Sequence, residues 1–393
     1  MKATNNRLLA LDVLRGITIA GMIMVNNPGS WSKVYAPLGH ASWNGLTPTD
    51  LVFPFFMFIM GISTYISLRK YKFEFSQSAM LKILKRTAVI FAIGLGIAWL
   101  SLAMRTFNAL RAEDIPFFEC LGKAAWNFEN IRILGVMQRL ALTYGATAII
   151  ALLVKHKYIP YIIVAGLLGY FILLICGNGF EFSENNIISI IDRAVLGAQH
   201  MYKDTLPDGS RIALDPEGLI STIPAICHVL IGFYCGKLIM DTKDNHQRIE
   251  RLFLVGVILT FAGFLLSYGC PINKKIWSPT FTIATCGLAA SFLALLIWII
   301  DIKGHKRWTK FFEVFGINPL FIYVAAAVLS ILIGNILISY GGQAMSIKTF
   351  LYAQVLQPIL GDYPASLAFA LLFVALNWAI GNVLYKKNIY IKI

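Results

Sequence analysis

The stretch from Val25 to Gly61 places chemically capable side chains between the end of one apolar segment and the start of the next. His40 lies in this stretch, and histidine is the side chain that gives or takes a proton near neutral pH. Asn26 carries an amide donor of the kind that stabilises a developing oxyanion in acyl transfer. These residues favour a group-transfer site, with His40 as base or nucleophile. The competing interpretation is a structural histidine held by hydrogen bonds in a loop.

Other polar residues of this stretch are open to two interpretations. Thr47 and Pro48 fit a helix start, with Thr47 as the N-cap and Pro48 in the first turn, and Asp50 is compatible with the same pattern. Asp50 is also a candidate contact to a substrate, together with Trp43 and Asn44. A tryptophan ring stacks on sugar faces, but it equally anchors a chain at a membrane interface.

Two pairs of polar residues lie within apolar segments, where ionisable groups are costly. Asp12 and Arg15 are three residues apart and share one helical face. They predict either an intrahelical salt bridge or a contact of Arg15 with an anion, oriented by Asp12. Gln138 and Arg139 lie one to two turns inside another segment. A buried Arg139 must face protein, water or an anion.

Further charged residues lie directly before apolar segments. Arg132 precedes the fourth segment and is a candidate contact to a substrate. Asp215 and Glu217 precede the sixth, where acidic side chains favour a helix start. Lys274 and Lys275 precede the eighth, and Lys275 is included among the candidate contacts to a substrate.

The composition indicates what kind of protein must position these residues. Of the 393 residues, 58% are hydrophobic and 14% are charged, against about 45–50% and about 25% in soluble proteins. The mean hydropathy is +0.69. A soluble chain this apolar could not cover its surface with polar groups. Secreted, cytosolic and disordered classes are therefore excluded, and the lipid bilayer is the expected surrounding.

A helix needs about 20 mostly apolar residues to cross a hydrocarbon core of about 30 Å. Ten segments meet this requirement, so we predict an all-α, polytopic membrane bundle of about 10 transmembrane helices. The segments are Leu8–Asn26, Asp50–Leu68, Thr87–Met104, Ile133–Val154, Ile159–Cys176, Leu219–Met240, Leu252–Tyr268, Phe281–Ile300, Pro319–Ile338 and Pro364–Leu384. The first does not resemble a cleavable signal peptide, because Asp12 and Arg15 interrupt it.

The net charge of +14 belongs mainly to one side of the predicted bundle. If the N-terminus is cytoplasmic, the inner segments hold 21 lysine and arginine residues and the longer outer segments hold 11. The positive-inside rule then predicts that both termini are cytoplasmic and that His40 is on the outer side. Because most acidic residues fall outside, the basic charge does not indicate binding to nucleic acid.

The predicted outer loops are long, at about residues 27–49, 105–132 and 177–218. Loops of this length in a compact protein are usually functional. The stretch 339–363 is too short and mixed for a span and predicts an interfacial or re-entrant helix. No internal repeat or low-complexity linker divides the chain, so residues 1–393 are expected to form a single transmembrane domain.

The six cysteines show neither a C-x-x-C pair nor the spacing of a zinc site. Most lie in apolar stretches, where a free cysteine behaves as a small hydrophobic residue. We expect no metal site. The sequence leaves open whether Cys120 and Cys270 form a disulfide.

Seven motifs resemble the heparan-α-glucosaminide N-acetyltransferase family. In order they are LDVLRG, VNNPGSW, HASWNGLTPTDLVFPFFMFIMG, RILGVMQRLALTY, LDPEGLISTIPA, NKKIWSPTFT and INPLFIYV. The resemblance begins at Leu8 and reaches the final LYKKNIYIKI. It implies that His40 is the catalytic histidine and that Asn26 lies near the acetyl group. It is a resemblance to a bacterial-type membrane core without the lumenal N-terminal domain of the lysosomal members, and it implies a location in the cell inner membrane.

The resemblance implies a membrane-embedded acetyltransferase. Such an enzyme moves the acetyl group of cytosolic acetyl-CoA, its co-substrate, to the amine of a terminal glucosamine-type sugar on the opposite side of the membrane. The phosphates of CoA are expected toward the basic cytoplasmic side, and the candidate cofactor contacts are Arg15, Asp12, Arg139 and Gln138.

The alternative function is an amino-sugar transporter related to N-acetylglucosamine uptake, which an inverted repeat would favour. The sequence shows no such repeat, and its polar residues crowd the outer ends of the early spans. It leaves open the identity of the acceptor glycan, the choice between an acetyl-histidine intermediate and direct transfer in a ternary complex, and whether the protein is a homodimer.

Overall fold

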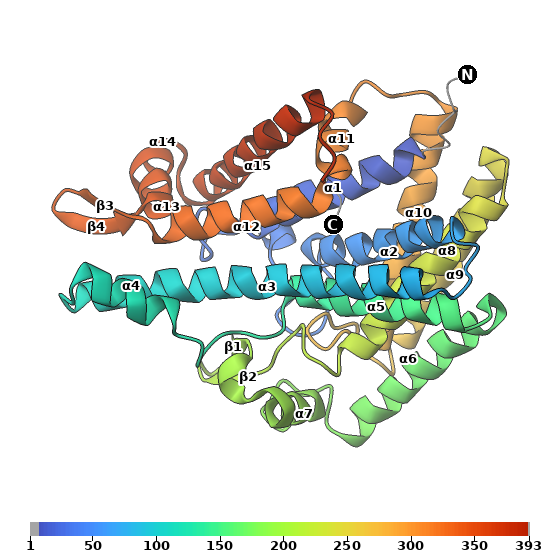
Figure 1. Cartoon of the computed structure of the whole chain (residues 1–393), viewed down its shortest axis with the longest axis horizontal. Helices are drawn as coiled ribbons and strands as arrows, with labels where there is room; N and C mark the ends of the chain where they lie inside the picture. Colours follow the sequence, from blue (N-terminus) through green and yellow to red (C-terminus); the bar gives the residue numbers. More distant parts are fainter. Residues whose placement is uncertain (1–7, 392–393) are drawn as a thin grey trace.

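The computed structural model describes residues 8–391 and shows a bundle of long helices with two short hairpins (Figure 1). Within these residues, eight helices are long and apolar enough to cross a membrane. They are α2 (Pro48–Arg69), α3 (Gln77–Ala112), α5 (Val136–Leu153), α6 (Ile159–Cys176), α8 (Thr222–Asp241), α9 (Asn245–Leu266), α10 (Pro279–Leu296) and α15 (Asp362–Lys386). The remaining two predicted spans contain α1 (Leu9–Val25) and α12 (Pro319–Asn335), the latter preceded by α11 (Thr309–Ile317). The predicted all-α, polytopic membrane fold is confirmed.

α11 and α12 meet at an angle of 84°, so the chain bends sharply between them. Pro319 lacks the backbone N–H that would continue the hydrogen-bonding pattern of α11. The Asn318 side chain fixes the bend. It donates to the Ile389 carbonyl oxygen over 2.8 Å and accepts from the Ile391 N–H over 2.9 Å.

α3 extends well beyond the predicted span of residues 87–104. Its 36 residues form about 54 Å of helix, against about 30 Å of hydrocarbon. α4 (Phe117–Ala125) then folds back along the end of α3, and Trp99 Nε1 donates to the Ala125 carbonyl oxygen over 2.9 Å. Most of the connection 105–132 is therefore helical rather than a loop (Figure 1).

The other long connections contain shorter elements. Residues 177–218 include α7 (Ile187–Leu196) and an antiparallel hairpin of β1 (Lys203–Thr205) and β2 (Arg211–Ala213). After α12 the chain forms a second hairpin, followed by two short helices with a π-helical turn between them. These are β3 (Leu337–Tyr340), β4 (Gln343–Ser346), α13 (Ile347–Phe350), the π-helical turn Leu351–Leu356 and α14 (Gln357–Leu360). Residues 27–49 are mostly irregular, with a 3-10 turn at Ala36–Leu38.

All six cysteines carry free thiols. Cys120 and Cys270, whose pairing the sequence left open, are both buried and are not joined. Within residues 8–391, no group of three or more His, Cys, Asp or Glu side chains is arranged to hold a metal ion.

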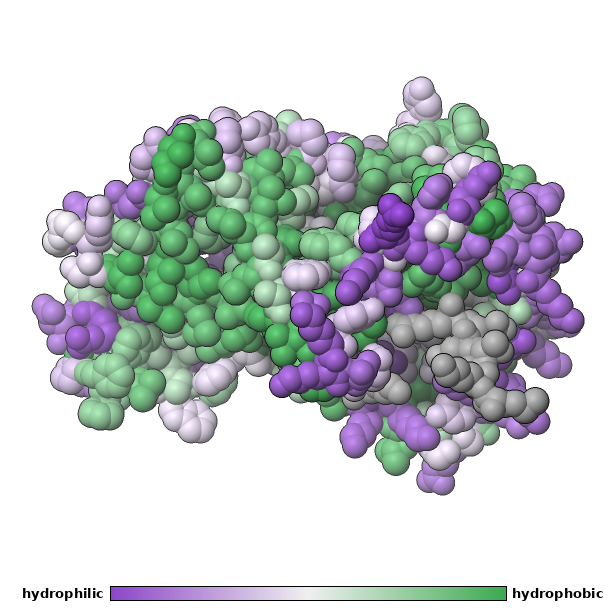
Figure 2. Space-filling model, turned by 90° about the horizontal axis from the view of Figure 1, so that it is seen from above, coloured by the Kyte–Doolittle hydropathy of each residue, from purple (hydrophilic) through white to green (hydrophobic). Residues whose placement is uncertain are grey.

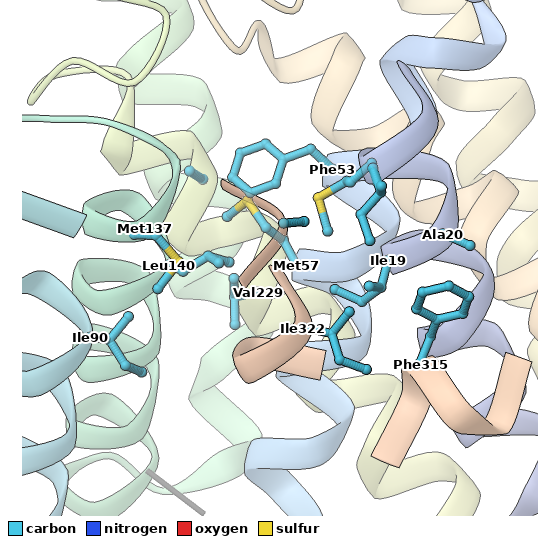
Figure 3. Packing of buried hydrophobic residues seen from close by; sticks show 14 of the residues in the cluster. Ile19, Ala20, Phe53, Met57, Ile90, Met137, Leu140, Val229, Phe315 and Ile322 are labelled. Atoms are coloured by element: carbon cyan, nitrogen blue, oxygen red, sulfur yellow. The ribbon is translucent and has the colours of Figure 1, made fainter. Parts of the chain in front are cut away.

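The largest buried cluster lies where α1, α2, α5, α8, α10 and α12 meet, and Figure 3 shows part of it from close by. Ile19 from α1, Phe53 and Met57 from α2, and Met137 from α5 belong to it. In a membrane, such contacts stabilise the bundle mainly through close packing, because lipid tails are as apolar as the side chains. This packing fixes Phe53, which also lines the cavity described below.

α2 and α8 approach so closely that two of their glycines leave no room for a side chain. A Cβ atom on Gly61 would lie 2.2 Å from the Val229 carbonyl oxygen. One on Gly232 would lie 2.2 Å from the Phe58 carbonyl oxygen. Small residues allow helix backbones to pack at this distance in membranes. The contact holds the start of α2 and the loop before α8 in a fixed relation.

Polar and apolar surfaces are separated along the long axis of the molecule. In Figure 2, hydrophobic side chains cover much of the visible face, while hydrophilic side chains gather toward the right-hand end. In Figure 1 the connections α2–α3, α5–α6 and α8–α9 lie toward the same end. These connections carry lysines and arginines that the sequence places on the inner side. The chain is thus a multi-pass membrane protein with one basic end.

Candidate active site

A cavity of about 110 Å³ brings together residues that are far apart in the sequence. It lies where the end of α1, the starts of α2, α5 and α12, and the loops before α8 and α10 meet. Its lining consists of Met22, Val25, Asn26, His40, Thr49, Val52, Phe53, Val136, Glu217, Lys274 and Tyr323. The structure therefore places His40 and Asn26, both selected from the sequence, at one cavity.

A buried carboxylate holds His40. The Nδ1 atom of His40 lies 2.6 Å from Asp50 Oδ1, and the Asp50 side chain is 1% exposed while that of His40 is 42% exposed. Because an ionised carboxylate only accepts hydrogen bonds, Nδ1 carries a proton and donates it. In neutral His40 the other ring nitrogen, Nε2, is then unprotonated and able to act as a base or nucleophile.

The local sequence explains the position of Asp50. It is the third residue of α2, and its Oδ2 accepts hydrogen bonds from the backbone N–H groups of Thr47 and Ala41, each over 3.1 Å. The bond from Thr47 is half of a capping box. The helix-start interpretation and a chemical role for Asp50 are therefore compatible, because the capping bonds hold the carboxylate beside His40.

Lys274 lies against the same pair. Its Nζ is 3.4 Å from Asp50 Oδ1 and 3.1 Å from His40 Nδ1. Since Nδ1 donates its proton to Asp50, it cannot also accept one from Lys274, so the ion pair with Asp50 is the stabilising contact. Burial lowers the pKa of Lys274, while the carboxylates of Asp50 and Glu217 oppose this effect.

Asn26 ends α1 as its C-cap residue. Its backbone N–H donates to the Met22 carbonyl oxygen over 3.1 Å. The neighbouring Asn27 side chain folds back onto the Ile23 carbonyl oxygen over 2.7 Å. By contrast, the carboxamide of Asn26 is exposed and makes no hydrogen bond to any residue between 8 and 391. It is available as a donor at the cavity.

Glu217 lines the cavity although the sequence did not single it out as a site residue. Arg132 Nη2 donates to Glu217 Oε2 over 2.6 Å, and the same guanidinium binds Asp215 through hydrogen bonds of 2.9 and 2.6 Å. Burial alone would raise the pKa of Glu217, but the guanidinium groups of Arg132 and Arg139 lower it below its ordinary value. Glu217 is therefore an ionised carboxylate on the cavity wall. Arg132 itself is occupied by these two acids.

Trp43 and Asn44 hold the His40 loop against neighbouring loops. Trp43 Nε1 donates to the Phe180 carbonyl oxygen over 2.8 Å, and its ring stacks on Phe182 with a centroid distance of 4.6 Å. Asn44 Oδ1 accepts from Asn273 Nδ2 over 3.1 Å. Neither lines the cavity, so a contact of either residue with the substrate stays a prediction.

The two neighbouring lysines have different surroundings. Lys274 lines the cavity, whereas Lys275, the one selected from the sequence, forms an ion pair with Asp204 of β1 and lies 4.6 Å from the Phe182 ring centroid. The motif NKKIWSPTFT, which contains both lysines, indicated that this loop belongs to the site, but it did not show which lysine faces the cavity. Tyr323 of α12 lies in the motif INPLFIYV, but nothing in that apolar motif indicated that this residue lines a cavity.

Arg139 and Gln138 lie in the first turn of α5 and are both buried. Arg139 Nη2 donates to the Gly218 carbonyl oxygen over 3.2 Å and to the Ser221 hydroxyl, and its guanidinium lies 5.0 Å from the Trp277 ring centroid. These contacts give the buried arginine protein partners at Nη2. Its Nε and Nη1 are buried and receive no hydrogen-bond partner from the described residues. A role of either residue in binding a cofactor stays a prediction.

Asp12 and Arg15 lie toward the other end of α1, with Arg15 about 16 Å along the helix from Asn26. Arg15 Nη1 pairs with Asp12 over 3.0 Å, and Nη2 donates to the Ser63 hydroxyl over 2.8 Å. Nη1 also reaches the Gly316 carbonyl oxygen over 3.3 Å. The salt-bridge interpretation fits these contacts, and an anion contact of Arg15 stays a prediction.

Comparison with known proteins agrees with the motifs. Residues 7–270 match the family model described as heparan-alpha-glucosaminide N-acetyltransferase, catalytic. The chain is similar to the heparan-alpha-glucosaminide N-acetyltransferases of Homo sapiens, at 30% identity over 378 residues, and Mus musculus, at 28% over 383. The alignments cover 82% and 84% of this chain but 53% and 54% of those proteins, so the chain spans about half the length of the relatives it matches. The chain belongs to the heparan-alpha-glucosaminide N-acetyltransferase catalytic-domain family.

Proposed function

We propose that the protein transfers the acetyl group of acetyl-CoA to the amine of a terminal glucosamine-type sugar. One observation carries this proposal: His40, held by the buried Asp50, shares a cavity with the carboxamide of Asn26, which makes no hydrogen bond to any of residues 8–391. The names of the relatives supply the acetyl group and the sugar class. Because the chain spans about half of those relatives, both are proposals for this protein.

Acetyl transfer to an amine needs a deprotonated nitrogen, a stabilised oxyanion and two reactants held together. His40 Nε2 takes a proton from the acceptor amine, and the Asp50 carboxylate stabilises the imidazolium that forms. The nitrogen bonds to the acetyl carbon, and Asn26 donates a hydrogen bond to the carbonyl oxygen as it gains charge. The carbon–sulphur bond then breaks, and the imidazolium returns its proton to the CoA thiolate.

The cavity is small, so only the reacting ends of the two substrates are expected to enter it, with the body of CoA outside. We propose that its phosphates extend toward the basic end of the bundle, where Arg15 and Asp12 lie. Arg139 and Gln138 would contact it nearer to the cavity.

The same residues also serve a two-step route, in which His40 Nε2 attacks the thioester and becomes acetylated. In this route acetyl-CoA alone labels His40. Direct transfer in a ternary complex never acetylates His40 and forms product only when an acceptor is present. Mass spectrometry of the peptide that contains His40, after incubation with acetyl-CoA alone, separates the two routes.

We propose that the protein lies in the cell inner membrane, with both termini on the cytoplasmic side and the cavity on the outer side. The support is the excess of basic residues in the inner segments. Cysteines introduced at Lys33 and Lys306 should react with a membrane-impermeant thiol reagent from opposite sides, in a background where the exposed Cys176 is replaced by serine. Labelling of both from one side would contradict the orientation.

The function is tested with purified protein, acetyl-CoA and glucosamine, by following release of free thiol and formation of the acetylated sugar. We expect thiol release that depends on the acceptor and is lost in His40→Ala, because acid–base catalysis contributes about 10²–10⁴-fold. His246→Ala, at an exposed histidine of α9, is the matched control. Transport of the sugar without thiol release would favour the transporter instead.

A further inference from the structure

Two formally charged side chains line the cavity, Glu217 and Lys274. Lys274 is paired with Asp50, which is buried behind His40. Glu217 is paired with Arg132, but Arg132 is shared with Asp215. Arg132 thus contacts two carboxylates with one guanidinium, and Arg139, which also acts on Glu217, makes no ion pair with either of them among the described residues.

One oxygen of Glu217 is free to bind a ligand. Oε2 accepts from Arg132 over 2.6 Å, while Oε1 receives no hydrogen bond from any residue in the described part of the chain. The side chain is 13% exposed. The carboxylate is therefore held in place by Arg132 at one oxygen and presents the other at the cavity.

Two further carboxylates near the cavity, Asp215 and Asp50, have no comparable free oxygen. Asp215 is 0% exposed, and its oxygens accept from Arg132, from the Tyr202 N–H and from the Glu217 N–H. Asp50 is occupied by His40, its capping bonds and Lys274. Glu217 is the carboxylate among these three that is placed to meet a substrate.

We infer that Glu217 recognises the acceptor by binding its amine in the positively charged ammonium form, and so selects amino sugars over sugars that carry only hydroxyl groups. This inference rests on the proposed function and adds the residue that determines acceptor specificity. A primary amine beside a sugar ring is mostly protonated near neutral pH, as α-amino groups are. A hydroxyl at this position would gain only a hydrogen bond to the carboxylate, whereas an ammonium also gains the attraction between opposite charges.

Binding as ammonium is compatible with the chemistry, provided that protons are accounted for. His40 Nε2 takes one proton from the bound ammonium, which frees the lone pair for attack on the acetyl carbon. A second proton leaves the nitrogen after the carbon–nitrogen bond forms and the carbon–sulphur bond breaks. The products are the amide, the CoA thiol and one proton released to solvent, so no further reactant is needed.

The test measures equilibrium binding of glucosamine and of glucose to the full-length protein without acetyl-CoA. The two probes differ in an amine against a hydroxyl at one carbon. We expect the wild type to prefer glucosamine, and Glu217→Gln to weaken glucosamine binding about 10- to 100-fold while leaving glucose binding almost unchanged. Asp208→Asn, at an exposed acid of the outer side that binds only Ser210, is the matched control and should keep the preference.

Binding and turnover separate this inference from the proposed function. A wild type without preference for glucosamine, or a Glu217→Gln protein that keeps the preference, overturns the role of Glu217 whether or not acetyl transfer occurs. If the wild type prefers glucosamine but forms no acetylated product, the proposed acetyltransferase function is contradicted, while the recognition of the amine by Glu217 is not. If Glu217→Gln does not fold, Glu217→Asp is the alternative, because it keeps the charge but shortens the side chain. It should bind glucosamine more weakly than the wild type does, but still in preference to glucose. Loss of the preference in this variant would contradict the inference.

Discussion

Replacing Asp50 with asparagine tests whether this carboxylate acts through His40. Asparagine has the same shape. With its amide oxygen at the position of Oδ2 it still accepts hydrogen bonds from the backbone N–H groups of Thr47 and Ala41, and its N–H₂ group then faces His40; with the amide turned over, the oxygen faces His40 and these two bonds are lost. The substitution removes the negative charge that lies 2.6 Å from His40 Nδ1 and 3.4 Å from Lys274 Nζ.

The expected loss of rate follows from the hydrogen bond that changes. A charge-assisted hydrogen bond contributes about 1.5–3 kcal/mol, and about 1.4 kcal/mol corresponds to a factor of ten in rate. If the imidazolium loses this stabilisation in the transition state, kcat falls about 10- to 150-fold. If the new amide turns its N–H₂ group toward Nδ1, the ring takes the other tautomer and Nε2 no longer acts as a base. The loss then approaches about 10⁴-fold.

The assay is kcat from thiol release at saturating acetyl-CoA and acceptor, with the Kd for acetyl-CoA and thermal unfolding measured on the same preparation. Asp362→Asn is the matched control, because Asp362 forms an ion pair of 2.7 Å with Lys33 and does not line the cavity. A folded Asp50→Asn protein that binds acetyl-CoA and turns over at the wild-type rate would refute the assigned pairing of Asp50 with a catalytic His40.

Three further substitutions probe other parts of the molecule. Asn26→Ala should lower kcat about 10²–10³-fold with less effect on KM in steady-state kinetics, because an oxyanion donor acts mainly in the transition state. Arg132→Met should lower the free energy of unfolding by about 3–5 kcal/mol, because it leaves the fully buried Asp215 without its cation. Burial raises the pKa of Asp192 to about 6, so the folded protein retains a proton that the unfolded chain loses near pH 4, and this contribution to stability is lost as the pH rises toward 6. Asp192→Asn should therefore gain stability relative to the wild type, by up to about 3 kcal/mol, between unfolding measurements at pH 4 and at pH 7.

The membrane fold could be predicted because the bilayer imposes one requirement on each span, namely enough apolar residues in a row to hide its backbone. That requirement does not depend on tertiary contacts. It does not determine where a helix ends outside the hydrocarbon, and α3 continues past Arg105 to Ala112 because nothing in that stretch interrupts its backbone hydrogen bonds. The bend at Asn318 depends on bonds to residues more than 70 positions away, which no local pattern reveals.

The candidate site, too, could be predicted from the sequence only in part. His40 and Asn26 could be selected because their residue types carry chemical meaning at the end of an apolar segment. The choice between Lys274 and Lys275 depends on a turn in which the Ser278 N–H donates to the Asn273 carbonyl oxygen over 2.9 Å, and the sequence does not show which lysine that turn directs inward.

Glu217 illustrates a different difficulty. Acidic residues before a helix already have a sufficient structural explanation, so their pattern alone did not indicate a role at the site. Its place on the cavity wall depends on Arg132, which comes from a different connection and is bound to two acids at once.

The close contact of α2 with α8 has a consequence for any survey of random mutations. Gly61 lies about 16 Å along α2 from Asp50, and an added methyl group there must push the two helices apart. The displacement would reach the start of α2 and the loop that carries Glu217, although Gly61 and Gly232 touch no reactant. A screen that scores activity alone would rank these glycines beside His40. The two glycines would differ from His40 in one respect: at the glycines every larger residue would lower activity, whatever its chemistry.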